Sequence, residues 1–175
     1  MSGEIFRKVK FFGAWQDEKE EAWLGEMAQE GYHLNGVGFP LVYEFRKGKP
    51  QREVYRLDYT SLKKKQDRED YFQLFRDAGW EWVGEMGGWQ YFRKEVAEGE
   101  TAEIYTDNQS KIKKYQRVLG LLVILLPAFI FVFQQREGQT LLTQILEGFM
   151  FLIMLLYMYA ILRLIKRLQE LKEDS

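Results

Sequence analysis

The residues best suited to chemistry in this chain are carboxylates, because the usual nucleophiles and metal ligands are nearly absent. The sequence holds one histidine, His33, and no cysteine. A single imidazole without thiolates cannot complete the four-ligand zinc sites that proteins use. Ser61 and Ser110 have no base beside them in the sequence, whereas a serine nucleophile needs one within hydrogen-bond reach. We therefore predict no metal, no cofactor and no catalysis.

The acidic clusters are expected to stabilise the N-terminal turns of helices. They comprise Glu18, Glu20 and Glu21 in one predicted helix and Glu69 and Asp70 in another. Carboxylates in a first turn favour the helix dipole, and Asp17 followed by Glu20 has the spacing of a capping box. Asp67, with Asp70 three residues later, is expected to cap the second helix in the same way. The glycine-containing runs 36–38 and 84–88 fall in predicted hairpins. They lack the lysine and the following helix of a phosphate-binding loop.

Aromatic side chains are the second notable group. They make up 16% of the chain, and all five tryptophans precede residue 90. The predicted strands carry rings on both alternating faces, which is more than one sheet face can bury against two short helices. The surplus predicts a pocket, a dimer interface or a partner surface.

The elements that position these rings form two predicted strand-helix-strand-strand repeats, 5–47 and 53–95. Gly31 and Gly79, each predicted to end a helix, are separated by the same interval as Trp23 and Tyr71. The pattern indicates an α+β domain over residues 1–95. We expect an antiparallel sheet with both helices on one face.

The remaining chain predicts a linker over 96–110 and a transmembrane helical hairpin with a helical tail over 111–171. Residues 118–133 carry no charged or polar side chain, and a second apolar stretch covers 141–162. A helix needs about 20 apolar residues to span a bilayer. A buried soluble hairpin is the alternative, but the apolar residues continue around every helix face, with no polar stripe.

Basic residues beside the two predicted spans indicate their orientation. They are Lys111, Lys113, Lys114 and Arg117 before the first span and Arg163, Lys166, Arg167 and Lys172 after the second. The loop between the spans, 134–140, holds only Arg136. The positive-inside rule then predicts a two-span protein of the cell membrane with both termini in the cytoplasm. The formal net charge of −1 gives no field for nucleic acid.

Several short motifs together resemble one bacterial family, known as domain of unknown function 2812. The motifs are Trp15, the segments 20–24, 27–28, 31–32, 55–59, 79–81, 88–94 and 104–107, and Tyr71 and Phe75. The resemblance covers residues 5 to about 115. It implies two following membrane helices, which are usual in the family, but no catalytic residues. It also implies a regulatory or sensory role and a PadR-like regulator as a possible partner, because PadR-like genes are common neighbours.

Tandem strand-helix-strand-strand modules are also similar in topology to GyrI-like effector-binding domains. That resemblance implies an aromatic pocket with a buried carboxylate, which favours lipophilic cations. The candidate walls are Tyr43, Tyr59, Trp80, Trp82 and Trp89. The candidate acids are Glu81, Glu44, Asp58 and Glu85.

Two functions from different classes follow. The first is a membrane-anchored sensor or regulator whose aromatic domain binds a lipophilic ligand or a protein partner. The second is a subunit of an oligomeric membrane assembly, for example a transport-related one, in which the hairpin is the working part. Glu147 bears on the second, because an ionisable residue within a span is a functional candidate. Its place near the start of the span also suits the outer interface, and two helices enclose a pathway only as a homo-oligomer.

Overall fold

The computed structural model describes residues 5–38, 41–60, 65–97, 108–134 and 140–173. The elements in chain order are β1 (Ile5–Val9), α1 (Asp17–Gln29), β2 (Tyr32–Gly38), β3 (Val42–Lys47), β4 (Glu53–Tyr59), α2 (Lys65–Asp77), β5 (Glu81–Met86), β6 (Trp89–Glu95), α3 (Asn108–Gln134) and α4 (Leu141–Glu173). The chain divides into two compact units, Met1–Thr106 and Asp107–Ser175.

The first unit contains two three-stranded antiparallel sheets with the same internal order. The strands run β1-β3-β2 in the first sheet and β4-β6-β5 in the second. Each sheet has one irregularity at a matching place, between Leu34 and Gly36 in β2 and between Trp82 and Gly84 in β5. The bulged strands β2 and β5 lie against each other. The two sheets therefore meet at this pair of outer strands.

Helix α1 packs against both sheets and provides the main core of the domain. Its apolar residues recur at helical spacing, as Trp23, Leu24, Met27 and Ala28, and all four are buried. They pack with Leu34, Tyr43 and Phe45 of the first sheet and with Tyr55, Leu57 and Tyr91 of the second. The helix ends where Gly31 adopts a φ of 84°, a conformation that costs glycine little.

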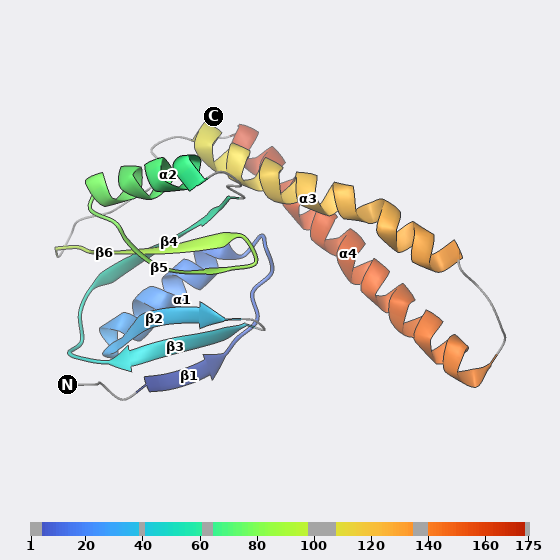
Figure 1. Ribbon diagram of the computed structural model, residues 1–175, viewed down its shortest axis with the longest axis horizontal. Coiled ribbons are helices and arrows are strands. Elements are labelled where there is room, and N and C mark those ends of the chain that lie inside the picture. Colours follow the sequence, from blue (N-terminus) through green and yellow to red (C-terminus); the bar gives the residue numbers. More distant parts are fainter. Residues whose placement is uncertain (1–4, 39–40, 61–64, 98–107, 135–139, 174–175) are drawn as a thin grey trace. The chain divides into compact units, whose positions relative to one another are not determined.

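Helix α2 covers the opposite face of the second sheet. Phe75 of α2 stacks on Phe92 of β6, with 4.1 Å between ring centroids. Trp80 and Val96 complete this smaller core. In Figure 1, α2 lies above the strands of the second sheet, whereas α1 lies below them and beside the first sheet.

The expectation of one antiparallel sheet with both helices on one face is therefore wrong. Neighbouring residues on one strand, such as Tyr91 and Phe92, are both fully buried but face opposite ways. A sheet with apolar side chains on both faces must be covered on both. The second sheet is accordingly enclosed between α1 and α2.

The second unit consists of α3 and α4, which pack against each other. Within the described residues, one helix is long and apolar enough to cross a membrane, over Thr143–Glu173. This candidate span indicates membrane association, as predicted. The prediction of two spans and of their orientation goes further than this finding.

Candidate functional site

A cavity of about 340 Å³ opens at the N-terminal end of α1, and we call it the α1 cavity. Its lining comes from the β1–α1 connection, α1 itself, and both sheets: Phe12, Gly13, Ala14, Asp17, Glu20, Leu41, Tyr43, Leu57, Met86, Gly87, Trp89 and Tyr91. The cavity volume is in the range of small-molecule sites, which are mostly apolar with a few polar groups. The lining has this character.

Two buried carboxylic acids line the α1 cavity, Asp17 and Glu20, which are 2% and 6% exposed. Glu20 is the one that bonds to both sheets. The hydroxyl of Tyr43, on β3, donates a 2.7 Å hydrogen bond to Glu20 Oε1, and the hydroxyl of Tyr91, on β6, donates one of 2.6 Å to the same oxygen. Both donors thus bind Oε1, and among the described residues the second oxygen, Oε2, accepts no hydrogen bond.

Burial changes the acidity of this cluster. Desolvation raises the pKa of Glu20 above its ordinary value of 4.5, the two tyrosine hydrogen bonds oppose the rise, and the nearby charge of Asp17 adds to it. Desolvation and the Glu20 charge also raise the pKa of both Tyr43 and Tyr91. Their hydroxyls therefore stay protonated and act as donors at physiological pH.

The Glu20 carboxyl has no ionic partner in the part of the chain that the structure describes. Its hydrogen bonds there come from the two tyrosine hydroxyls alone. A buried carboxylate without a cation is costly unless it is neutralised or paired. The cluster can therefore take up a proton or a ligand cation.

Leu41, in the wall of the α1 cavity, has an unusual backbone conformation. Its φ is 59°, and it is the one non-glycine residue of the described chain with positive φ. A left-handed conformation costs a residue with a Cβ roughly 1–2 kcal/mol. Such strain concentrates at ligand-binding and active sites. Leu41 therefore keeps its place in the cavity wall at an energetic cost.

The ring residues expected to form a pocket are only partly brought together. Tyr43 and Trp89 both line the α1 cavity. Tyr59 contacts Trp89, with 5.5 Å between ring centroids, but lines a different cavity. Trp80 lies in the core beneath α2, and Trp82 is 42% exposed. The last two therefore lie away from the α1 cavity.

Each of the four acids expected from the topology has a partner outside the α1 cavity. Glu81 accepts hydrogen bonds of 2.8 and 3.0 Å from Arg93 and is exposed. Glu44 pairs with Arg7, Asp58 accepts from Tyr71, and Glu85 lies 3.8 Å from Arg68. The acids that line the α1 cavity are Asp17 and Glu20 instead.

Two expectations at the start of α1 and α2 are wrong. The residue before α1 is Gln16, with no side-chain cap hydrogen bond, so Asp17 is the first helical residue and not a cap. Glu20 turns to the two tyrosines rather than back to the chain. Asp67 likewise lies inside the first turn of α2, which begins at Lys65.

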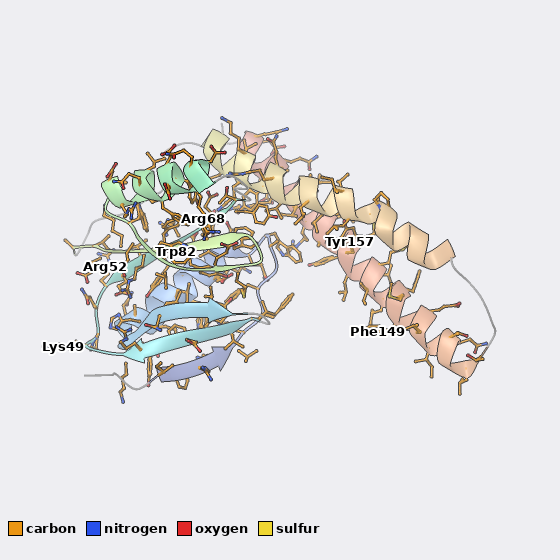
Figure 2. The ribbon with its side chains drawn as sticks, viewed as in Figure 1. Lys49, Arg52, Arg68, Trp82, Phe149 and Tyr157 are labelled. Atoms are coloured by element: carbon orange, nitrogen blue, oxygen red, sulfur yellow. The ribbon has the colours of Figure 1, made fainter. Side chains whose placement is uncertain are left out.

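His33, the sole histidine, connects its own strand to the segment that leads into β4. Its Nδ1 lies 3.0 Å from Glu53 Oε1 and its Nε2 lies 2.8 Å from the carbonyl oxygen of Lys49. Lys49 is labelled in Figure 2. Both nitrogens of the imidazole are thus engaged by the protein, and the ring links β2 to the start of β4.

Fold and site together define a class of protein: an α+β domain with a ligand-sized apolar cavity over a buried carboxylate, joined to a candidate membrane helix. Residues 16–127 match a family model described as "Protein of unknown function (DUF2812)". The match spans more than half of the chain, and the chain belongs to this family, as its motifs predicted. No curated protein and no solved structure matches it.

Proposed function

We propose that this protein is a membrane-anchored sensor whose α1 cavity binds a lipophilic organic cation. The observation that carries the proposal is the Glu20 carboxyl, buried at an apolar wall with both tyrosine hydroxyls on one oxygen. The ligand's apolar body would fill the cavity, and its charge would lie against Glu20 Oε2.

The aromatic lining favours a cation over a neutral compound of the same shape. Phe12, Tyr43 and Trp89 line the cavity, and aromatic ring faces attract a nearby positive charge. Inside a low-dielectric cavity, an ionised carboxylate strengthens that attraction further. The ligand's positive charge would also favour the ionised form of Glu20, which burial alone disfavours.

The anchoring part of the proposal concerns the second unit. Helix α4 supplies one candidate span, and the apolar run in α3 supports a second that packs beside it. Two spans with basic flanks would place both termini in the cytoplasm. Ligand occupancy would then be read out at the membrane surface, by a homo-oligomer or a regulator of the PadR-like type.

Matching features of the two halves of the binding domain support an internal duplication. Helices α1 and α2 both have 13 residues, the strand orders of the two sheets match, and their bulges fall at corresponding places. We infer that 5–47 and 53–95 are two copies of one unit.

The direct test is ligand titration of the full chain in a maltoside detergent. The probes are phenyltrimethylammonium, a permanent aromatic cation, and tert-butylbenzene, its neutral isostere. We expect saturable binding of the cation. Calorimetry measures it directly, and tryptophan fluorescence reports it as well because Trp89 lines the cavity. The neutral probe should bind about tenfold or more weakly, a difference of about 1.4 kcal/mol.

Glu20→Gln keeps the side-chain shape but removes the charge. The variant should therefore bind the two probes with equal affinity. Glu21→Gln is the matched control, because Glu21 is adjacent and buried but does not line the cavity. Its carboxyl accepts hydrogen bonds from Leu57 N and from the Arg56 guanidinium. Glu147→Gln should leave binding unchanged. Absence of binding by the cation, or equal cation binding by Glu20→Gln and the natural chain, would contradict the proposal.

The membrane orientation of the chain can be tested independently by labelling introduced cysteines, because the natural chain has none. A single cysteine introduced at Arg136 should react with an impermeant thiol reagent added outside intact cells. Cysteines introduced at Ser2 and at Ser175 should react only after the membrane is opened. The reverse pattern, or labelling of all three from outside, would exclude the proposed orientation.

A further inference from the structure

A second cavity, of about 330 Å³, opens beside α2, and we call it the α2 cavity. Its lining residues are Tyr59, Thr60, Arg68, Phe72, Glu85, Gly87, Gly88 and Gln90. Gly87 lines both cavities. The tip of the β5–β6 hairpin thus lies between a largely apolar cavity and a polar one.

The cation of the α2 cavity is Arg68, in the first part of α2. Its guanidinium lies 5.5 Å from the ring centroid of Phe72, and Phe72 in turn contacts the ring of Trp82 at 5.4 Å. Arg68 and Trp82 are both labelled in Figure 2 and lie close together below α2. The guanidinium faces Glu85 at 3.8 Å, a separation longer than a hydrogen bond. The Arg68 side chain, which is 52% exposed, therefore rests on the ring of Phe72 and is only loosely paired with Glu85.

Gln90 adds an unused donor to the same cavity. It is 96% buried, since its exposed fraction is 4%, and its Oε1 accepts a 2.9 Å hydrogen bond from Trp82 Nε1. That bond fixes which end of the amide is the acceptor, so the Nε2 group is the end left to donate. Among the described residues Nε2 has no hydrogen-bond partner. Gln90 Nε2 is not among the fully buried side-chain atoms that lack a hydrogen bond in the described chain. It is therefore accessible to a molecule in the cavity.

Two hydroxyls extend the set of donors. Tyr59 and Thr60 are 7% and 6% exposed, and within the described chain neither hydroxyl has a hydrogen-bond partner. Burial raises the pKa of Tyr59, which keeps its hydroxyl protonated. The cavity thus gathers a guanidinium, an amide and two hydroxyls.

The α2 cavity occupies the position in the second half that the α1 cavity has in the first. Arg68 is the fourth residue of α2, as Glu20 is the fourth of α1. Gln90 is the second residue of β6, as Tyr43 is the second of β3. Equivalent positions therefore carry a carboxylate with a phenol in one half and a guanidinium with an amide in the other.

We propose that the α2 cavity is a second binding site, specific for an oxyanion carried by a small molecule. Arg68 supplies the charge, Gln90 Nε2 and the hydroxyls of Tyr59 and Thr60 supply hydrogen bonds, and Phe72 supplies an apolar wall. Arginine with additional neutral donors is the usual arrangement for carboxylate and phosphate groups. Glu85 is the competing anion, and a ligand displaces it from Arg68.

Phenyl phosphate and benzoate are suitable probes for the full chain in maltoside detergent, which carries no charge. We expect saturable binding by calorimetry, broadening of the phosphate signal in phosphorus NMR, and a shift of one tryptophan indole N–H signal, because Trp82 is bonded to Gln90. Arg68→Gln should weaken binding by about tenfold or more, in line with loss of a charge-assisted contact.

Two further variants make the test specific. Glu85→Gln removes the competing anion, so phenyl phosphate should bind several-fold more tightly. Arg76→Gln is the matched control, since Arg76 lies on the same helix and bonds to Gln73 outside the cavity. Absence of binding by both probes, or equal binding by Arg68→Gln and the natural chain, would overturn the second site. Neither result would affect cation binding in the α1 cavity.

Discussion

The hydroxyl of Tyr91 donates a 2.6 Å hydrogen bond to Glu20 Oε1, joining residues 71 positions apart in the chain. Tyr91 belongs to the second sheet, whereas Tyr43, the other donor to this oxygen, belongs to the first. The carboxyl therefore links both sheets to α1 at the α1 cavity. A change in the state of Glu20 acts on all three elements at once.

Replacing Tyr91 by Phe should destabilise the domain. The substitution keeps the ring but removes one of two donors from a buried carboxyl, a loss of about 1–2 kcal/mol. Thermal unfolding of the full chain, followed by near-ultraviolet circular dichroism, measures the effect. Tyr59→Phe is the control, because no hydrogen bond of the Tyr59 hydroxyl occurs among the described residues. Equal stability of the two variants would contradict the role of the Tyr91 hydroxyl.

The stability of the domain should depend on pH through Glu20. The folded state raises the pKa of this carboxyl above 4.5, with desolvation as the main cause. The contribution of Glu20 to stability is therefore fully present below pH 4.5 and is lost as the pH rises through the folded-state pKa. Glu20→Gln should remove this part of the pH dependence. Unfolding of both proteins over a pH series checks the prediction, and parallel curves would refute it.

Cation binding should show the opposite pH dependence. A protonated Glu20 has no charge to offer, so the affinity for phenyltrimethylammonium should fall as the pH is lowered through the folded-state pKa. Binding at low pH should also release a proton, which calorimetry in buffers of different ionisation enthalpy detects. An affinity independent of pH would show that the ligand charge does not meet Glu20.

Glu21 should contribute to stability without affecting the ligand. Its Oε1 accepts a 2.7 Å hydrogen bond from Leu57 N, on β4, which is an outer strand of its sheet. Glu21→Ala leaves that buried N–H without its acceptor, at a cost of about 1–3 kcal/mol. Glu21→Gln keeps an acceptor and should cost less. The comparison of their unfolding midpoints tests the assignment, and the reverse order would contradict it.

At Leu41, replacement by glycine should destabilise the domain less than replacement by alanine, which reverses the usual order. The φ of 59° at this residue favours glycine, so Leu41→Gly should be more stable than Leu41→Ala by about 1 kcal/mol. Both variants should bind the cation more weakly, because each removes the same wall of the α1 cavity. Thermal unfolding and titration of the pair measure the two effects separately. A less stable glycine variant would show that Leu41 is not strained.

The sequence by itself determined the local elements of this protein. Helical periodicity located α1 and α2, the glycines at 31 and 79 marked their ends, and the apolar composition of α4 identified a candidate span. These features depend on residues within a few turns of one another, where propensity and hydrophobic periodicity act. Even locally, the capping role expected of Asp17 is wrong, because Asp17 is the first residue of the helix and Gln16 holds the cap position.

Only the tertiary structure decided the layering and the site. The alternating rings on β6 were equally compatible with one sheet and with two. Which of these arrangements forms depends on which helices cover each face of the sheet. In the same way, Glu20 became a buried acid because Tyr43 and Tyr91 approach it from 23 and 71 residues away. Burial and desolvation arise from such distant contacts, and no local pattern of residues encodes which carboxylate will experience them.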